Sequence, residues 1–224
     1  MKIALIGGHG KVALRATPAL VAAGHEVISV IRNPAHRQDV EAAGATAKVV
    51  DIETLDQLAW NELLSDSFDA VIWSAGAGGG DPERTWNVDF LAAKRSMVAA
   101  ARAGVPKYLM VSFIGASLRH QISPDSSFWH YAQAKAEADT FLRGSGLTYL
   151  ILGPSTLTLD DATAAISPLE HSETATASDN SAVASTSRGN VALAVAAAVD
   201  APASIWNRTI DFTDGHTPIA EVFS

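Results

Sequence analysis

Tyr131 and Lys135 are the pair of side chains whose types and spacing most directly indicate acid–base chemistry. They lie four residues apart in the stretch HYAQAKAEA, which places them on the same face of a helix. A phenol has a pKa near 10, and a neighbouring ammonium stabilises the phenolate and brings that pKa towards neutral pH. With three tyrosines in the chain, roughly 0.08 such pairs are expected by chance. The spacing therefore favours a functional pair over two surface residues of a helix.

The stretch GGHGKVA follows an apolar run and precedes a segment with helical spacing. Gly7, Gly10 and Ala13 match the pattern G-x-x-G-x-x-A between a predicted strand and a predicted helix. Backbone N–H groups at such a helix start, together with the helix dipole, bind a pyrophosphate. The loop therefore predicts a dinucleotide site rather than an ordinary turn. The cofactor contacts expected from it are Gly7, Gly8, His9, Gly10, Lys11 and Val12.

The end of the second predicted strand decides between the two nicotinamide dinucleotides. An acidic residue there would hydrogen-bond the ribose hydroxyls of NAD, but this chain reads SVIRNPAHR. Arg32, with Asn33 beside it, is placed to bind the 2′-phosphate of NADP, and Arg37 is a second candidate cation. We therefore expect NADP or NADPH as the cofactor in preference to NAD. The alternative is that Arg32 is a solvated residue at a helix start.

Small and polar residues after the later strands complete the expected cofactor site. Asp51 and Ile52 follow the third strand, where Asp51 would lie at the edge of the adenine. Small side chains after the fourth strand leave space beside the cofactor. The expected contacts from the fourth strand onward are Ser74, Ala75, Gly76, Ser112, Tyr131, Lys135, Pro154 and Ser155.

The elements that position these residues alternate between short apolar strands and helices. This alternation predicts a parallel sheet covered on both faces, which is a doubly wound α/β (Rossmann) fold. Strands are predicted at 2–7, 26–31, 46–51, 69–76, 107–113 and 147–154, with helices at 12–24, 34–44, 53–64, 83–103 and 131–146.

Residues 1–154 are predicted to form the dinucleotide-binding core, and residues 155–224 a small substrate-side lobe within the same domain. The composition shifts to Ala, Ser and Thr at 155–187, which predicts irregular or short-strand structure. A last helix at 188–201 and a strand at 207–213 close the chain. Ligands of such sheets bind at the carboxyl ends of the strands, so the late segment is expected to cover the site.

Composition excludes several classes of function. The net charge of −8 disfavours nucleic acid as a partner, because binding it requires a basic surface. The absence of cysteine excludes disulfides and thiolate metal sites, and the histidines lack the spacing of a metal site, so no metal is expected. Glycines interrupt the first apolar run too early for a signal peptide, and no run is long enough to span a membrane. We therefore expect a cytoplasmic protein without membrane contact.

The whole chain resembles the atypical, NmrA-like members of the short-chain dehydrogenase/reductase superfamily. The matching stretches are GGHGKVA, VIRNP, VVDI, WSAGAG, NVDF, GVPKYLMVSF, YAQAK, SGLTYLILGPS and SRGNVA. The resemblance implies that Tyr131 is the general acid or base, and that Lys135 lowers its pKa and holds the nicotinamide ribose. Several members bind NADP and reduce small molecules, whereas others bind it and regulate.

Two departures from the family pattern bear on the chemistry. Members commonly carry a serine pair or triplet after the fifth strand, whereas this chain has Ser112 followed by Phe113 and Ile114. Ser112 is therefore the remaining serine candidate for the catalytic site. Members also commonly show Arg-Pro after the sixth strand, whereas this chain has Gly153 and Pro154 and lacks that cation.

The leading hypothesis is an NADP-dependent oxidoreductase that passes a hydride between nicotinamide and a small carbonyl, quinone or flavin-like substrate. The alternative is a redox sensor that binds NADP(H) without turnover and reports to a protein partner. The reduced serine motif favours the sensor, and the Tyr131–Lys135 pair opposes it. A sugar-nucleotide epimerase or dehydratase ranks third, because the segment after Pro154 is short for enclosing a second nucleotide.

Overall fold

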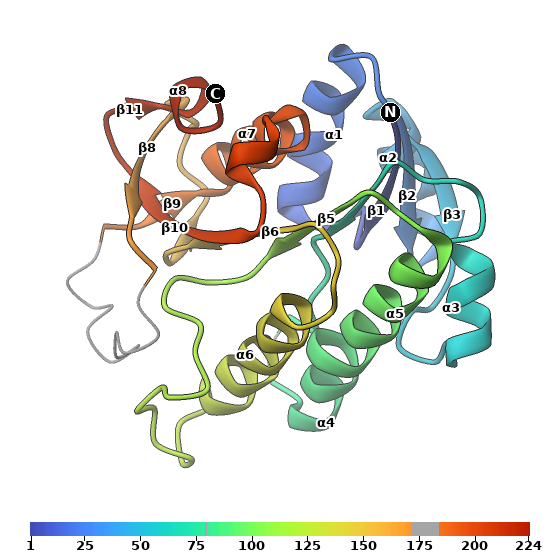
Figure 1. Ribbon diagram of the computed structural model, residues 1–224, viewed down its shortest axis with the longest axis horizontal. Helices are drawn as coiled ribbons and strands as arrows, with labels where there is room; N and C mark the ends of the chain where they lie inside the picture. Colours follow the sequence, from blue (N-terminus) through green and yellow to red (C-terminus); the bar gives the residue numbers. More distant parts are fainter. Residues whose placement is uncertain (79, 172–183) are drawn as a thin grey trace.

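The computed structural model describes residues 1–78, 80–171 and 184–224, and its centre is a sheet of nine strands in the described ranges (Figure 1). Residues 79 and 172–183, the latter within the predicted 155–187 segment, lie outside the described residues. The strand order is β11-β8-β10-β6-β5-β4-β1-β2-β3. The strands are β1 Lys2–Ile6, β2 Glu26–Ile31, β3 Thr46–Val49, β4 Ala70–Trp73, β5 Lys107–Val111, β6 Tyr149–Pro154, β8 Ala165–Leu169, β10 Arg208–Asp214 and β11 Thr217–Pro218.

The pairs from β3 through β10 are all parallel, which confirms the predicted doubly wound α/β fold. The central strands are mostly apolar, as expected of strands that helices cover on both faces. Every residue of β4 is buried, as are four of the five residues of β1. Each predicted core strand is present in the structure, and its ends differ from the predicted ends by at most a few residues.

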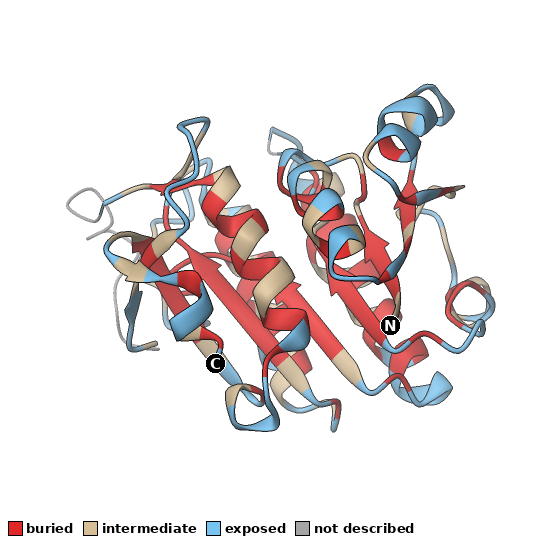
Figure 2. Cartoon of the chain, turned by 90° about the horizontal axis from the view of Figure 1, so that it is seen from above, coloured by how far each residue is buried: buried red, intermediate tan, exposed pale blue. Residues whose placement is uncertain are grey.

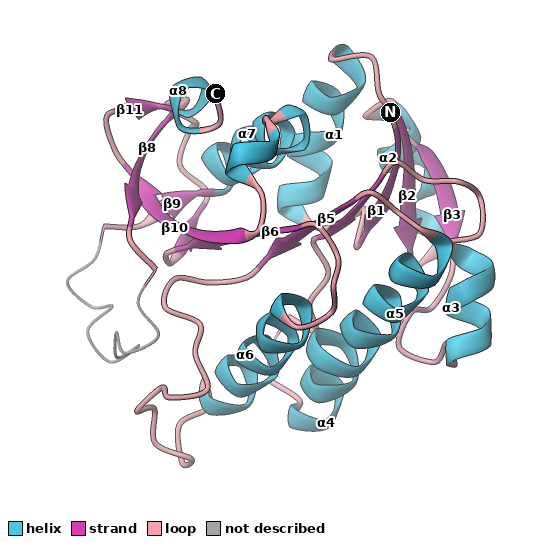
Figure 3. Ribbon diagram, viewed as in Figure 1, coloured by secondary structure: helices cyan, strands magenta, loops and turns pink. Residues whose placement is uncertain are grey.

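Two layers of helices enclose the sheet, as the colouring of Figure 3 makes plain. One layer packs on the core that includes Leu5 and Leu150, and the other on the core that includes Ile6 and Ile151. Buried residues concentrate on the strands and on the inward faces of these helices (Figure 2). The first layer holds α1 (Lys11–Ala22), α2 (Arg37–Ala42), α7 (Arg188–Asp200) and α8 (Ile219–Val222); the second holds α3 (Gln57–Leu63), α4 (Pro82–Thr85), α5 (Ala93–Ala103) and α6 (Trp129–Arg143).

The segment predicted as one helix at 83–103 is divided in the structure. After α4 it widens into a π-helix, η2 (Trp86–Ala92), and then continues as α5. Within η2, Asp89 is fully buried and accepts a hydrogen bond from the backbone N–H of Ala77. A π-helical stretch is uncommon and is frequently found at functional sites. The widened turn coincides with a carboxylate that points into the protein, which a 3.6-residue periodicity does not reveal.

Residues after 154 extend the same sheet. β10 pairs in parallel with β6, and β8 then pairs antiparallel with β10 and with β11. Two short strands, β7 (Leu157–Thr158) and β9 (Thr186–Ser187), form a separate parallel pair just before α7. The segment 155–187 thus contains the short strands that its composition allowed.

The order of the strands reverses between β1 and β4. β1 continues to β2 and β3 on one side, and β4 continues to β5 and β6 on the other. In open α/β sheets ligands bind beyond the carboxyl ends of the strands at this reversal. The topology therefore places the expected site above Gly7 and Ser74.

Candidate functional site

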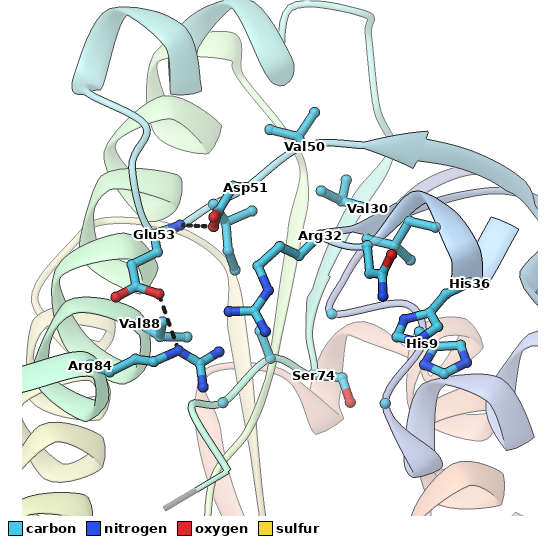
Figure 4. Close-up of a pocket in the computed structure, with 17 residues that line it drawn as sticks. His9, Val30, Arg32, His36, Val50, Asp51, Glu53, Ser74, Arg84 and Val88 are labelled. Carbon is cyan, nitrogen blue, oxygen red and sulfur yellow. Dashed lines mark hydrogen bonds and ion pairs between the residues drawn. The ribbon is translucent and has the colours of Figure 1, made fainter. Parts of the chain in front are cut away.

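A cavity of about 330 Å³ lies at the carboxyl ends of β1 to β4 (Figure 4). It will be called the first cavity. It is where the dinucleotide was expected from the sequence. Of the expected cofactor contacts, those that line it are Gly7, His9, Gly10, Arg32, Asn33, Asp51, Ile52, Ser74, Ala75 and Gly76.

The glycine loop has the geometry of a phosphate cradle. Gly7 has a φ of +83°, and a Cβ there would lie 2.6 Å from the backbone of Ala75, so both conformation and space require glycine. Gly10 is the N-cap of α1 and offers no side-chain acceptor, so the first N–H groups of the helix remain for a ligand. These features fit a bound pyrophosphate.

Three expected contacts, Gly8, Lys11 and Val12, do not line the first cavity. Gly8 is packed against Ser29, and its N–H donates to the carbonyl of Val30 at 3.0 Å. Val12 is buried in the core below α1, and Lys11 is exposed. Gly8 therefore serves the packing of the loop on β2, and Val12 can meet a phosphate only through its backbone N–H group at the start of α1.

Arg32 lines the first cavity and points into it (Figure 4), whereas Arg37 is not among the residues that line it. The Arg37 Nη1 donates to Glu41 Oε1 and to the carbonyl of Ala47, both at 3.2 Å. The expectation of Arg37 as a second cation is therefore wrong, because its helix directs it to β3. Arg84 of α4 is the other arginine that lines this cavity.

Residues from several other strands, helices and loops complete the first cavity, and sequence reasoning missed them. His36 stacks on His9 with ring centroids 3.5 Å apart, and His9 Nε2 lies 2.9 Å from Asp39 Oδ2. Arg84 donates from Nε to Glu53 Oε2 at 3.2 Å. No periodic pattern signals such contacts because they join segments far apart in sequence. The unforeseen lining residues are Val30, Ile31, His36, Val50, Glu53, Arg84 and Val88.

A second cavity of about 660 Å³ follows at the ends of β5 and β6, next to β4 in the sheet. Rings of Phe113, Phe128 and Tyr131 form one wall, with centroids 5.4–5.6 Å apart. Of the expected site residues, Ser112, Tyr131, Pro154 and Ser155 line it. Its other lining residues are Gly78, Gly80, Phe113, Ile114, Ser127, Phe128, Thr156, Leu157 and Arg188.

Tyr131 and Lys135 share a face of α6, but only Tyr131 lines the second cavity. Lys135 is buried behind it, where its Nζ donates to the carbonyl of Val111 at 3.0 Å and lies 3.5 Å from Asp89 Oδ1. The same Nζ is 6.0 Å from the centre of the Tyr131 ring. The structure thus adds Asp89, which sequence reasoning missed, to the surroundings of the pair.

Burial raises the pKa of Tyr131 above its ordinary value, and Lys135 offsets this only in part. Lys135 lowers the Tyr131 pKa, as predicted. The expected shift of that pKa towards neutral pH is wrong, because the loss of solvation outweighs the effect of the ammonium. For Lys135, burial acts to lower the pKa, but the neighbouring phenol and carboxylates together raise it by more. At neutral pH the pair consists of a phenol and an ammonium.

Ser112 is tied to a buried carboxylate. Its hydroxyl donates to Asp139 Oδ2 at 2.6 Å, and Asp139 lies one turn beyond Lys135 on α6. Burial raises the pKa of Asp139 to about 6, against the opposing effects of Ser112 and of the nearby Arg143. Ser112 therefore faces the second cavity with its proton directed away from it, and its oxygen retains acceptor capacity.

The position of the missing arginine is filled from β10. A Cβ on Gly153 would collide with the carboxylate of Asp211, so no side chain fits there. Asp211 Oδ2 accepts from the N–H of Gly115 at 3.1 Å and lies 2.8 Å from His171 Nδ1. His171 Nε2 is 3.2 Å from Arg143 Nη2. Gly153 is thus explained by the close approach of Asp211.

Metal sites and membrane-spanning helices are both absent from the described ranges. No group of three or more metal-binding side chains occurs among those residues. Nor does any helix described there combine the length and hydropathy needed to cross a membrane.

The sequence matches one protein family over most of its length. The profile of a family described as NAD(P)H-binding matches residues 7–202. A Bacillus subtilis (strain 168) protein named "Uncharacterized sugar epimerase YhfK" is 32% identical over 224 residues, covering 99% of this chain and 98% of that protein.

Solved structures share the fold over the full chain. A Bacillus halodurans protein, described as a candidate NAD-dependent epimerase/dehydratase, superimposes with a TM-score of 0.86 at 28% identity, covering 100% of this chain and 98% of that one. The oxidoreductase ylbE of Lactococcus lactis gives a TM-score of 0.83 at 25% identity, covering 100% and 95%. Both are similar to this protein along its whole length.

Proposed function

Because the chain belongs to the NAD(P)H-binding family, of the atypical short-chain dehydrogenase/reductase type that its sequence resembles, we propose that it is an NADP-dependent oxidoreductase. Its substrate would be a small carbonyl, quinone or flavin-like compound. The observation that carries the proposal is a pair of neighbouring cavities. The glycine loop and Arg32 line the first cavity, and the phenol of Tyr131 lines the second.

The proposed roles of the residues follow from their surroundings. When bound, NADPH supplies a hydride to the acceptor carbon. Tyr131 donates its phenol proton to the acceptor oxygen, so a carbonyl becomes an alcohol and the charge balances. Because burial keeps the Tyr131 pKa high, the phenol is protonated before reaction, as a general acid must be. Lys135 then stabilises the phenolate that remains.

The preference for NADP rests on Arg32. The 2′-phosphate of NADP carries the charge that a guanidinium binds with two parallel hydrogen bonds, and NAD lacks it. The neighbouring His9–His36 stack adds further donors at the same side of the cavity.

Calorimetric titration of the protein with NADPH, NADP, NADH and NAD tests both parts of the proposal. We expect the phosphorylated pair to bind at least about tenfold more tightly, since a charge-assisted hydrogen bond contributes roughly 1.5–3 kcal/mol. Arg32→Ala should remove this difference and leave the affinity for NADH unchanged. Arg37→Ala is the matched control and should change neither affinity, because its guanidinium is directed to Glu41 and Ala47.

Each result of the titration has a distinct meaning. Binding of none of the four dinucleotides would refute the proposed function. Equal binding of all four, unaltered by Arg32→Ala, would refute only the NADP preference.

A second candidate function is a redox sensor that binds NADP(H) without turnover. The observation that favours it is the Ser112 hydroxyl, which is committed to Asp139 and gives no proton to a substrate. A sensor should bind one redox form of the dinucleotide much more tightly than the other, which the same titration measures.

A sugar-nucleotide epimerase is the third candidate, favoured by the name of the Bacillus subtilis relative. The second cavity opposes it. A nucleoside diphosphate carries two phosphates, whereas the described lining contains a single cation, Arg188.

A further inference from the structure

Arg188 is the one charged side chain among the described residues that line the second cavity. Sequence reasoning gave it no role. It opens α7 directly after β9 and faces the same cavity as Tyr131, although the two residues are far apart in the chain.

The guanidinium of Arg188 is held in place by backbone on one side. Its Nη1 donates to the carbonyls of Leu157 and Thr158, both at 2.9 Å. These carbonyls belong to β7, which is paired with β9 immediately before Arg188. Ser187 caps α7 by accepting from the N–H of Asn190 at 3.0 Å, which fixes the start of the helix. A cation held this way loses little side-chain freedom on binding a ligand.

The remaining donors of Arg188 are available to an anion. Nε and Nη2 have no partner among the described residues, and a guanidinium carries five N–H groups in a planar fork. The start of α7 adds a partial positive charge on the same side.

The rest of the cavity is suited to a flat apolar ring. Phe113, Phe128 and Tyr131 form an aromatic wall, and Ile114 and Leu157 also line the space. Phe128 is 41% exposed although it is a large aromatic side chain, so a ligand ring would bury it.

We propose that the second cavity selects substrates that join an aromatic or conjugated ring to one acidic group, and that Arg188 binds the acidic group. The proposal rests on the proposed function, since it names the substrate class of the same site. A carboxylate held by Arg188 would orient the ring along the aromatic wall and bring its reducible group to Tyr131. Because Arg188 is the one charged side chain of the described lining, the cavity can neutralise a single negative charge on the ligand.

The test is a pair of fluorescent probes that differ in one charge. Anilinonaphthalene sulfonate is a flat aromatic monoanion, and phenylnaphthylamine is its neutral counterpart. Each is titrated into the protein saturated with NADP, so that the first cavity is blocked. We expect the anion to bind about tenfold more tightly than the neutral probe.

Three variants test whether Arg188 causes the preference for the anionic probe. Arg188→Met should reduce the affinity for the anion about tenfold and leave that for the neutral probe unchanged, whereas Arg188→Lys should keep most of the preference. Phe128→Ala should weaken both probes, because it removes part of the wall that they share. The melting temperature and the affinity for NADPH serve as folding controls for every variant.

The proposal is overturned if Arg188→Met binds the anion as wild type does, or loses both probes equally while its melting temperature is unchanged. If Arg188→Met does not fold, the wild-type preference and Arg188→Lys decide: equal binding of the two probes by wild type refutes the proposal. Failure of the proposed function is visible separately, as absence of dinucleotide binding; the probes are then titrated into the protein alone, with Arg32→Ala as the control for the first cavity.

Discussion

At the scale of single residues, the second cavity shows how burial and charge compete. Tyr131 lies near an ammonium, which lowers its pKa, but burial raises the pKa by more. The balance leaves a protonated phenol above a buried ammonium. This arrangement suits a group that gives a proton first and regains it later.

Tyr131→Phe removes the proton without removing the ring. We expect the variant to bind NADPH as wild type does, and to lose hydride transfer by about 10²–10⁴-fold, the usual contribution of a general acid. Stopped-flow absorbance of NADPH with an accepted substrate measures the transfer, and calorimetry measures the binding. Full activity in Tyr131→Phe would end the assignment of Tyr131 as the acid.

Asp139 makes stability depend on pH. Because burial raises its folded-state pKa to about 6, above the value of an unfolded carboxyl, the folded protein holds this proton more tightly. Its stabilising effect is therefore present below about pH 4 and is lost as pH rises through about 6.

The variant Asp139→Asn should remove that dependence. The free energy of unfolding of wild type, minus that of the variant, should fall by about 2 kcal/mol between pH 4 and pH 7. Urea denaturation at several pH values measures this, and other titrating groups cancel in the difference. A difference that stays flat, or rises with pH, would contradict the raised pKa.

At the scale of elements, two departures from regular structure build the site. The loop between β1 and α1 brings Gly7 and Gly8 against neighbouring strands, and the π-helix η2 directs Asp89 towards Lys135. The loop follows the end of β1, and η2 lies between the two α-helices α4 and α5. The side chains and backbone of the site are therefore positioned by segments that depart from regular strand or α-helix geometry.

Replacement by valine should have different effects at Gly8 and at Gly10: loss of stability at Gly8, and loss of dinucleotide binding at Gly10. Gly10 is exposed and has φ −60° and ψ 149°, which valine readily adopts. A Cβ there would lie 3.1 Å from the carbonyl oxygen of Gly7, which a small shift of the loop relieves, so Gly10→Val should fold and lose dinucleotide binding. A Cβ on Gly8 would lie 2.5 Å from the Cβ of Ser29, so Gly8→Val should lose stability by about 1–3 kcal/mol or more. Circular dichroism melts and NADPH titration distinguish the outcomes. Unchanged affinity in Gly10→Val would remove the loop from the site.

At the scale of the whole molecule, the residues before and after 154 share one sheet. β10 pairs with β6 away from either edge of the sheet, and α7 packs beside α1 on the same core. The C-terminal part also brings Arg188 to the second cavity. We therefore expect the substrate side and the cofactor side to depend on each other for stability.

This dependence predicts a single cooperative unfolding transition. Trp60 and Trp73 are buried in the N-terminal part and Trp206 in the C-terminal part, so tryptophan fluorescence reports on both. The Trp206 signal, obtained as the difference between wild type and Trp206→Phe, should have the same urea midpoint as the circular dichroism. Two separated midpoints would show that residues 155–224 unfold independently.

The sequence by itself determined the doubly wound fold and most of the first cavity. Both depend on local patterns: apolar strands alternating with helices, and a glycine loop between the first strand and the first helix. The carboxyl ends of parallel strands meet at one edge, so Arg32, Asp51 and Ser74 could be brought together from the order of the elements alone.

Only the tertiary structure decided the electrostatics and the rest of the lining. Asp89 and Arg188 enter the site from segments whose spacing carries no signal, because their partners lie far away in the chain. The direction of the Tyr131 pKa shift also depends on how far packing excludes water, which residue order does not encode. Local periodicity thus determined which elements form, whereas the close packing of distant segments decided which charges meet.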